Sequence, residues 1–215
     1  MRCSVQTAGQ AGPSLHRPAW CYPPFVAWPA STKKRARYED LLQLPDHLVG
    51  EILDGELFAT PRPAAPHAHA ASRLSGRLGP PFDEGRGGPG GWIILFAPEL
   101  HLQEDVVVPD LAGWRRTRLA SVPDAPFLTL APDWICEILS PSTERTDRLN
   151  KLPIYGREGV SHVWLINPTL RTLEVLRLEQ GRWVVAATHG GDRDAVTVEP
   201  FEAVPLDLSA IWSGR

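Results

Sequence analysis

Short apolar runs separated by polar turn residues dominate the chain from residue 92 onward. Six of these runs are rich in β-branched and aromatic residues, a composition typical of strands. They cover residues 92–102, 105–114, 133–140, 162–168, 172–178 and 182–189. The pattern therefore predicts six strands, of which the last three follow one another through short turns as a C-terminal β-meander.

Helical patterns lie before and between these runs. Residues 38–44 predict a short helix that the following proline ends. Residues 67–78 are alanine-rich with two leucines four positions apart, which favours a second helix. The turn dipeptide at 54–55 separates two extended pieces and indicates a hairpin or bulge. The polar, helix-prone segment 143–159 is long enough to cross between two parallel strands.

These elements predict an α/β domain with a central mixed β-sheet flanked by helices. Residues 1–36 are rich in proline and alanine without a sustained period, so we expect a disordered N-terminal extension before a folded domain at 37–215. The basic run at 33–37 is expected to be a solvated edge, with contact to phosphates as the alternative. The glycine-rich segment 83–91 predicts a flexible connection. It lacks the Gly-Lys-Ser/Thr ending of a phosphate-binding loop, which excludes that function.

Composition narrows the setting of the protein. The net charge of −3 over 215 residues gives no global attraction to polyanions, so nucleic-acid binding would need a local basic patch. Three widely spaced cysteines without a C-x-x-C pair are typical of a reducing compartment, and no run approaches the length of a membrane span. The N-terminus lacks the apolar core of a signal peptide. We therefore expect a cytoplasmic protein that does not contact membranes.

The stretch WICEILSPST carries one carboxylate, Glu137, in an otherwise apolar strand. With a period of two, apolar neighbours flank Glu137 whichever face of the strand is buried. A buried carboxylate needs a cation, a hydrogen-bond network or a route to water. The alternative is that Glu137 lies at a strand end or edge and reaches solvent directly.

A second candidate carboxylate is Asp110. Pro-Asp occurs four times, but only Pro109-Asp110 closes a β-branched run and is followed at once by more apolar sequence. Such a position lies at the exit of a buried strand, where α/β sheets commonly hold ligands. The alternative is a turn aspartate that only ends the strand. Asp110 and Glu137 on two core strands would together suit Mg²⁺, which prefers oxygen ligands.

Phosphodiester cleavage also requires a cation or proton-transfer group beside the attacking water. Lys151 is the candidate, because Asp147 and Tyr155 lie four residues on either side of it and share its face on a continuous helix. The alternative is a surface ion pair between Asp147 and Lys151 that contributes little. Pro153 adds a second question, since it either kinks this segment or begins a new helix.

Several separate blocks of the sequence resemble one known family. The blocks are Tyr38-Glu-Asp-Leu-Leu, Gly50-Glu-Ile-Leu-Asp-Gly-Glu, Pro61-x-Pro-x-x-x-His67, Val108-Pro-Asp-Leu, Ala131-Pro-Asp-Trp-Ile-Cys-Glu-Ile-Leu-Ser-Pro-Ser-Thr, Asp147-x-x-x-Lys151-x-x-x-Tyr155, Gly159-Val and Val163-Trp-Leu-Ile-Asn-Pro. From about residue 37 to the C-terminus the chain is similar to the Uma-type family of restriction-endonuclease-like proteins. This family belongs to the PD-(D/E)XK nuclease superfamily.

The resemblance implies a restriction-endonuclease-like core and assigns roles to individual residues. Asp110 and Glu137 would be the PD and acidic metal ligands, and Glu51 would be a third. The superfamily lysine expected two residues after Glu137 is a leucine here, so the resemblance implies that Lys151 supplies it from the following helix. His67 matches a family position near the start of a helix. It would either take part in the site or serve as a capping or packing histidine.

The resulting hypothesis is a DNA endonuclease that depends on Mg²⁺ or Mn²⁺. Backbone phosphates would be contacted by arginines after the Asp110 strand or beside Lys151, namely Arg115, Arg116, Arg118, Arg145 and Arg148. Cleavage of both strands would require two sites, so we expect a homodimer. The alternatives are a non-catalytic nuclease-fold module that binds DNA or a protein, and a hydrolase of RNA or of a small phosphoester.

Overall fold

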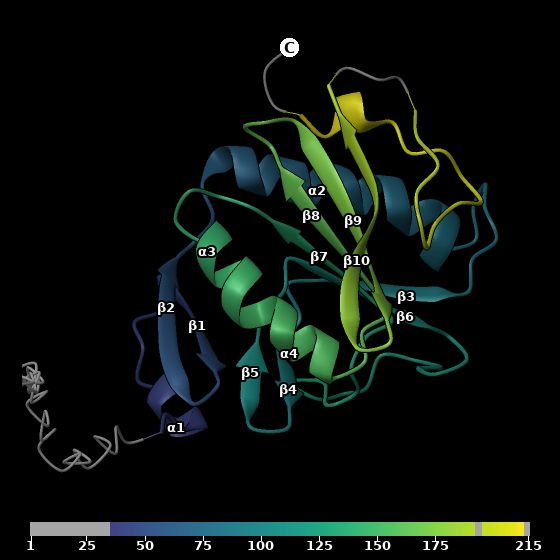
Figure 1. Ribbon diagram of the computed structural model, residues 1–215. Coiled ribbons are helices and arrows are strands. Elements are labelled where there is room, and N and C mark those ends of the chain that lie inside the picture. Colours follow the sequence, from purple (N-terminus) through teal and green to yellow (C-terminus); the bar gives the residue numbers. More distant parts are fainter. Residues whose placement is uncertain (1–34, 192–194, 213–215) are drawn as a thin grey trace, which may run out of the picture. The chain divides into compact units, whose positions relative to one another are not determined.

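A computed structural model describes residues 35–191 and 195–212 (Figure 1). Most of the predicted N-terminal extension, residues 1–34, lies outside the described residues, so its disorder stays a prediction. Arg35 forms an ion pair with Glu104, and the Ala36 N–H donates to the carbonyl of Gly55. The contacts of the folded unit therefore begin slightly before residue 37.

The larger of two sheets has six strands in the order β10-β9-β8-β7-β6-β3. Their bounds are β3 Trp92–Phe96, β6 Leu111–Arg115, β7 Trp134–Ile138, β8 His162–Asn167, β9 Thr172–Glu179 and β10 Arg182–Gly190. Only β7 and β8 pair in parallel, and every other pairing in this sheet is antiparallel. The mixed sheet, the helical crossover from β7 to β8 and the meander β8-β9-β10 match the fold class predicted from sequence.

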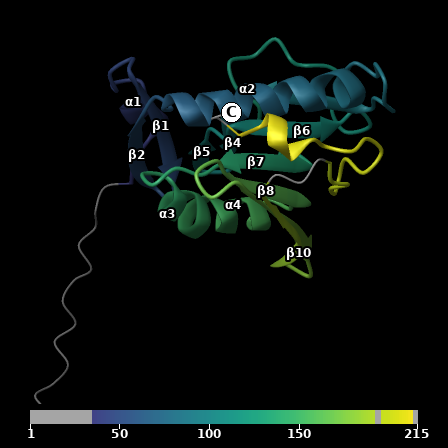
Figure 2. The same ribbon diagram turned by 90° about the horizontal axis from the view of Figure 1, so that it is seen from above.

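Helices cover both faces of this sheet, as the view from above shows (Figure 2). Helix α2, Ala65–Leu78, continues into a π-helical turn, Gly79–Asp83, and lies over one face. The crossover lies over the other face and consists of α3 Glu144–Thr146, a π-helical turn Asp147–Lys151 and α4 Leu152–Arg157. A 3₁₀ turn, Leu208–Ala210, lies near the C-terminal end of the described chain.

A smaller sheet has the order β2-β1-β5-β4 and lies beside the short helix α1 (Figure 1). The bounds are α1 Tyr38–Leu41, β1 Leu48–Leu53, β2 Glu56–Pro61, β4 Leu100–Leu102 and β5 Asp105–Val107. The hairpin predicted around residues 54–55 is therefore present as β1 and β2.

Two predicted strands are wrong in one respect, because each is divided between the two sheets. Residues 92–102 form β3 and β4, and residues 105–114 form β5 and β6. The breaks fall at Pro98 and Pro109, which have no N–H for a sheet ladder, and Ala97 adopts a positive φ of 45°. The chain thus passes twice between the sheets, and both crossings lie next to Asp110.

The period of two along β7 separates two hydrophobic clusters. Trp134, Cys136 and Ile138 pack on the α2 side, whereas Ile135 and Leu139 pack on the α4 side. Glu137 shares the α4 side, and only 2% of it is exposed. The alternative in which Glu137 reaches water at a strand end is therefore wrong, and the buried carboxylate needs partners inside the protein.

Candidate functional site

Charged side chains from three separate elements meet in the core on the α4 side of β7. Glu51 comes from β1, Glu137 from β7, and Asp147 and Lys151 from the crossover helix. At most 5% of each of these four residues is exposed. Asp110, between β5 and β6, lies beside them, and we call Glu51, Asp110, Glu137 and Asp147 the carboxylate cluster.

Lys151 is the central cation of this cluster. Its Nζ lies 3.0 Å from Glu51 Oε1, 3.3 Å from Glu137 Oε1 and 3.4 Å from Asp147 Oδ1. The i,i+4 pair of Asp147 and Lys151 faces the sheet rather than solvent, so it is not the surface ion pair considered as an alternative. One ammonium group therefore satisfies three buried carboxylates from three elements.

Tyr155 completes this arrangement from the next helical turn. Its hydroxyl donates to Glu137 Oε1 at 2.5 Å, and its side chain is fully buried. Pro153 lies in the first turn of α4, directly after the π-helical turn, and the segment stays helical through it. Asp147, Lys151 and Tyr155 therefore lie on one face, as their spacing predicted.

Asp110 is held at the sheet end where β6 begins and β7 ends. Its Oδ2 accepts the N–H of Ile138 at 2.7 Å and lies 3.1 Å from His67 Nε2. His67 is near the start of α2, and its Nδ1 is buried without a hydrogen-bond partner among the described residues. Glu51 is anchored similarly, because its Oε1 accepts the N–H of Val108 at 2.8 Å.

Burial and mutual repulsion control the ionisation of this cluster. Burial raises the pKa of Glu137 well above its usual range, although the Lys151 ammonium lowers it in part. The carboxylates of Asp147, Asp110 and Glu51 raise the pKa of Glu137 again. Burial alone would lower the pKa of Lys151, but the surrounding anions outweigh it and the pKa ends well above its usual value. Lys151 therefore stays charged at neutral pH.

This chain matches the Uma2 family, described as "Putative restriction endonuclease", over residues 38–209. The chain belongs to the Uma2 family. Among solved structures it is similar to "a putative nuclease belonging to DUF820" from Anabaena variabilis, with a TM-score of 0.67 and 21% sequence identity. The match covers 83% of this chain and 98% of the other, and it shows that the two share a fold. No curated protein matches the chain.

The carboxylate cluster of this Uma2 protein suits a hard divalent cation by its chemistry. Three carboxylates surround one lysine and Asp110 lies beside them, and carboxylate oxygens are the ligands that Mg²⁺ and Mn²⁺ prefer. Within residues 35–191 and 195–212, however, no three His, Cys, Asp or Glu side chains are grouped as a metal centre. The carboxylate cluster carries more negative charge than Lys151 neutralises, which suits a divalent cation. Without the cation, Lys151 pairs with the oxygens of Glu51, Glu137 and Asp147.

The predicted phosphate-contacting arginines do not gather at this cluster. Arg115 ends β6 and Arg116 follows it. Because β6 runs away from Asp110, about 17 Å of extended chain separates Arg115 from Asp110. Arg115 stacks on Trp92, with 4.5 Å from its guanidinium carbon to the ring centroid, and Arg116 pairs with Asp83 at 2.7 Å. The expectation that arginines directly after the Asp110 strand contact phosphates at the site is not met for these two, because the length of β6 places them at its other end.

The remaining three arginines differ from one another. Arg118 pairs with Asp133 at 3.0 Å. Arg148 lies near Lys151 in sequence but binds Glu174 through both terminal nitrogens, at 3.2 and 2.5 Å. Arg145 is exposed on α3. Of the five, Arg145 is the residue whose exposure and position beside the crossover leave it available to a phosphate.

Sequence reasoning missed a second buried anion, Asp105, at the start of β5. Asp105 accepts the N–H of Asp54 at 2.6 Å and pairs with Arg157 of α4. The sequence signal was an aspartate directly before a β-branched run, which we interpreted as a strand border. The contact links the small sheet to the crossover helix, so its role is structural.

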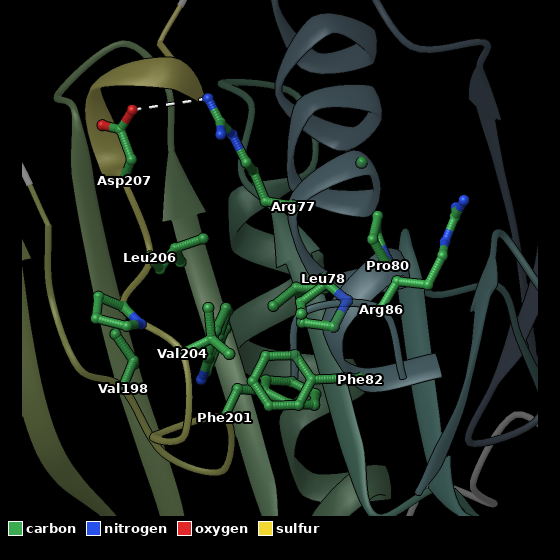
Figure 3. A pocket seen from close by; sticks show the side chains of 15 residues that line it. Arg77, Leu78, Pro80, Phe82, Arg86, Val198, Phe201, Val204, Leu206 and Asp207 are labelled. Carbon is green, nitrogen blue, oxygen red and sulfur yellow. Dashed lines mark ion pairs between the residues drawn. The ribbon is translucent and has the colours of Figure 1, made fainter. Parts of the chain in front are cut away.

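A pocket of about 300 Å³ lies elsewhere, between the C-terminal end of α2 and the segment 198–207 (Figure 3). Phe82, Phe201 and Leu206 line its apolar part, and Arg77 faces Asp207 at its rim at 3.7 Å. His67 lies at the other end of α2, and the carboxylate cluster does not line this pocket. The pocket is therefore separate from the ionisable groups described above.

Proposed function

We propose that this protein is a divalent-metal-dependent endonuclease that hydrolyses phosphodiester bonds of DNA. The observation that supports the proposal is the meeting of four carboxylates and one buried lysine at the end of a mixed sheet. Burying such charges costs free energy, and buried ionisable groups with perturbed pKa values cluster at functional sites. Membership of a family named for restriction endonucleases supports the same function.

Glu51, Asp110 and Glu137 would hold the metal. When bound, Mg²⁺ or Mn²⁺ supplies charge stabilisation at the phosphate and lowers the pKa of a water. The Lys151 ammonium lies between two of these carboxylates and would orient the attacking water or stabilise negative charge at the phosphate. Tyr155 fixes Glu137 through its hydroxyl, and His67 orients Asp110. Asp147 holds Lys151 from the same helix.

The expected partners extend this proposal. DNA is the proposed substrate, with Arg145 as a backbone contact. A homodimer would bring two sites to a duplex, and the proposed location is the cytoplasm. No helix in the described part of the chain is long and apolar enough to cross a membrane.

The deciding experiment is nicking of supercoiled plasmid by the full chain with Mg²⁺, with Mn²⁺ and with EDTA. Glu137→Gln keeps the shape of the side chain and removes its charge. A matched control is Glu199→Gln, which removes a carboxylate paired with Arg177 on the meander. We expect metal-dependent nicking that Glu137→Gln reduces at least about 100-fold, as for loss of one strong transition-state contact, and that Glu199→Gln leaves unchanged. Equal nicking by the wild type and Glu137→Gln would refute the assignment.

The non-catalytic module remains the second candidate, and one observation favours it. Lys151 already occupies the space among Glu51, Glu137 and Asp147, so the cluster is neutralised in part without a metal. Calorimetric titration with Mn²⁺ separates the candidates, since a module of this kind binds DNA or a protein without binding the metal. Parallel assays with RNA and with a small phosphodiester test the third possibility.

A further inference from the structure

An exposed aromatic ring lies at the end of β3, the edge strand beside β6. Trp92, Ile94 and Phe96 point to the α2 side of the sheet. Their burial by the rest of the protein decreases from Trp92 to Phe96. Trp92 is buried, Ile94 is half-buried and Phe96 is 59% exposed. No ring contact among the described residues involves Phe96. Phe96 therefore offers an unpartnered aromatic face to solvent.

This ring lies next to the proposed catalytic carboxylate. Phe96 is directly opposite Leu111 in the antiparallel pair of β3 and β6, and Asp110 immediately precedes Leu111. The next residue, Ala97, donates its N–H to the Asp110 carbonyl at 2.9 Å. Strand geometry places the Cα atoms of Phe96 and Asp110 about 6–7 Å apart. Asp110 also meets His67 of α2 at 3.1 Å, so its side chain reaches the α2 side to which Phe96 points. A nucleotide chain bound at Asp110 would therefore carry a neighbouring base within reach of the ring.

The turn after Phe96 fixes the position of the ring. Ala97 has a φ of 45°, a conformation that costs free energy for a residue with a Cβ. Its hydrogen bond to the Asp110 carbonyl holds this conformation. Because β3 is bound to β6 over five residue pairs, Phe96 is presented by a rigid strand end rather than by a loose loop.

Charge does not separate single-stranded from duplex DNA at this site, because both carry phosphates. Non-specific binding to duplex DNA depends on neutralising phosphates with free basic groups. Arg148 is engaged by Glu174 and Glu144, and Arg115 and Arg116 lie at the far end of β6. A contact that does not depend on charge, such as stacking on a base, would add affinity here, and a base is free to stack when it is unpaired.

We propose that Phe96 stacks on an unpaired base next to the scissile phosphate, so that the substrate is single-stranded or locally unwound DNA. The inference rests on the proposed nuclease function and specifies the substrate class of that site. Arg145 supplies a phosphate contact, and Phe96 supplies the contact that distinguishes unpaired from paired DNA. The ordinary alternative is an isolated apolar residue on a protein surface.

The test is equilibrium binding of the full chain, in EDTA, to a fluorescein-labelled 20-nucleotide single strand and to the blunt duplex of the same sequence. The variants are Phe96→Ala, Phe96→Leu and Phe96→Trp. The control is Val185→Ala, because Val185 is 58% exposed on β10 at the opposite edge of the same sheet. Thermal unfolding of each variant checks that the fold is intact, which the exposure of both side chains predicts.

We expect Phe96→Ala and Phe96→Leu to weaken single-strand binding roughly 5- to 140-fold, the range measured for loss of one stacked base. Phe96→Trp should bind as the wild type does, since the tryptophan ring also stacks, and duplex binding should change less than about twofold. Rescue by Trp but not by Leu separates stacking from apolar contact in general.

Each result decides the inference. Unchanged single-strand affinity in Phe96→Ala, equal losses on single strand and duplex, or no single-strand binding by the wild type would overturn it. The assay contains no metal and no cleavage, so its outcome is independent of plasmid nicking. Nicking without a Phe96 effect would leave the nuclease function and remove the stacking contact. A Phe96 effect without nicking would leave a single-strand-binding module and remove the nuclease function.

Discussion

Replacing Lys151 with methionine tests how the buried charges are balanced. The substitution keeps an unbranched side chain but removes the cation that lies 3.0–3.4 Å from Glu51, Glu137 and Asp147. At neutral pH the variant then contains buried carboxylates without a counter-ion, and removing one partner of a buried ion pair commonly costs about 3–5 kcal/mol. The cluster can limit this cost by taking up a proton.

Proton uptake by the cluster determines how much stability Lys151→Met loses and how that loss depends on pH. Lys151 lowers the pKa of Glu137 and of Asp147, so its loss raises both pKa values further. A folded-state pKa above the unfolded value means that the folded state binds more protons, and its stability falls as pH rises. Protonating one glutamate of ordinary pKa costs about 3.7 kcal/mol at pH 7 and about 1 kcal/mol at pH 5. The variant should therefore lose about 4 kcal/mol at pH 7 and about 1 kcal/mol at pH 5.

Urea unfolding in EDTA, followed by fluorescence of the tryptophans, gives the free energy of unfolding at each pH. The control is Arg148→Met, which breaks the part-exposed pairs with Glu174 and Glu144 and should cost about 1 kcal/mol or less at both pH values. A loss in Lys151→Met that is the same at pH 5 and pH 7 would refute the reasoning, because it would show that no carboxylate takes up a proton in place of the lysine.

Two further predictions concern packing and hydrogen bonding. Tyr155→Phe removes the donor to Glu137 and should lower the unfolding free energy by about 1–3 kcal/mol at pH 7 in urea titrations; a change below about 0.5 kcal/mol would contradict that bond. Gly113→Ala places a Cβ 3.1 Å from the buried ring of Trp134 and should destabilise by about 1–3 kcal/mol. Gly76→Ala, in open space on α2, should stabilise by up to about 1 kcal/mol. The two glycine variants should therefore shift the unfolding temperature in opposite directions in calorimetry. A shift in the same direction would contradict this prediction.

Local pattern was sufficient for much of the fold. Apolar alternation predicted the meander β8-β9-β10 and placed Glu137 among apolar residues of a strand, and the four-residue spacing of Asp147, Lys151 and Tyr155 predicted their common face. These features depend on the strand and helix periods alone, which are properties of neighbouring residues. Separate sequence blocks were also sufficient to indicate the family.

Other features depend on partners distant in sequence. Pro98 was a local signal for a break in the apolar run that forms β3 and β4, but the change of sheet there is set by the strands on either side. The stacking of Arg115 on Trp92 followed from the pairing of β6 with β3, and the burial of Lys151 followed from β1 covering it with Glu51. Each of these required knowledge of what packs against the element.

The sequence by itself determined the class of fold, the family and the residue types available for chemistry, because these follow from short-range periodicity and motif spacing. Tertiary structure alone decided that Glu51, Glu137 and Asp147 share one lysine, that His67 meets Asp110, and that Phe96 remains exposed beside them. The physical reason is that burial and charge pairing are properties of surfaces brought together from different elements. The same lysine on an uncovered helix would be a solvated surface charge.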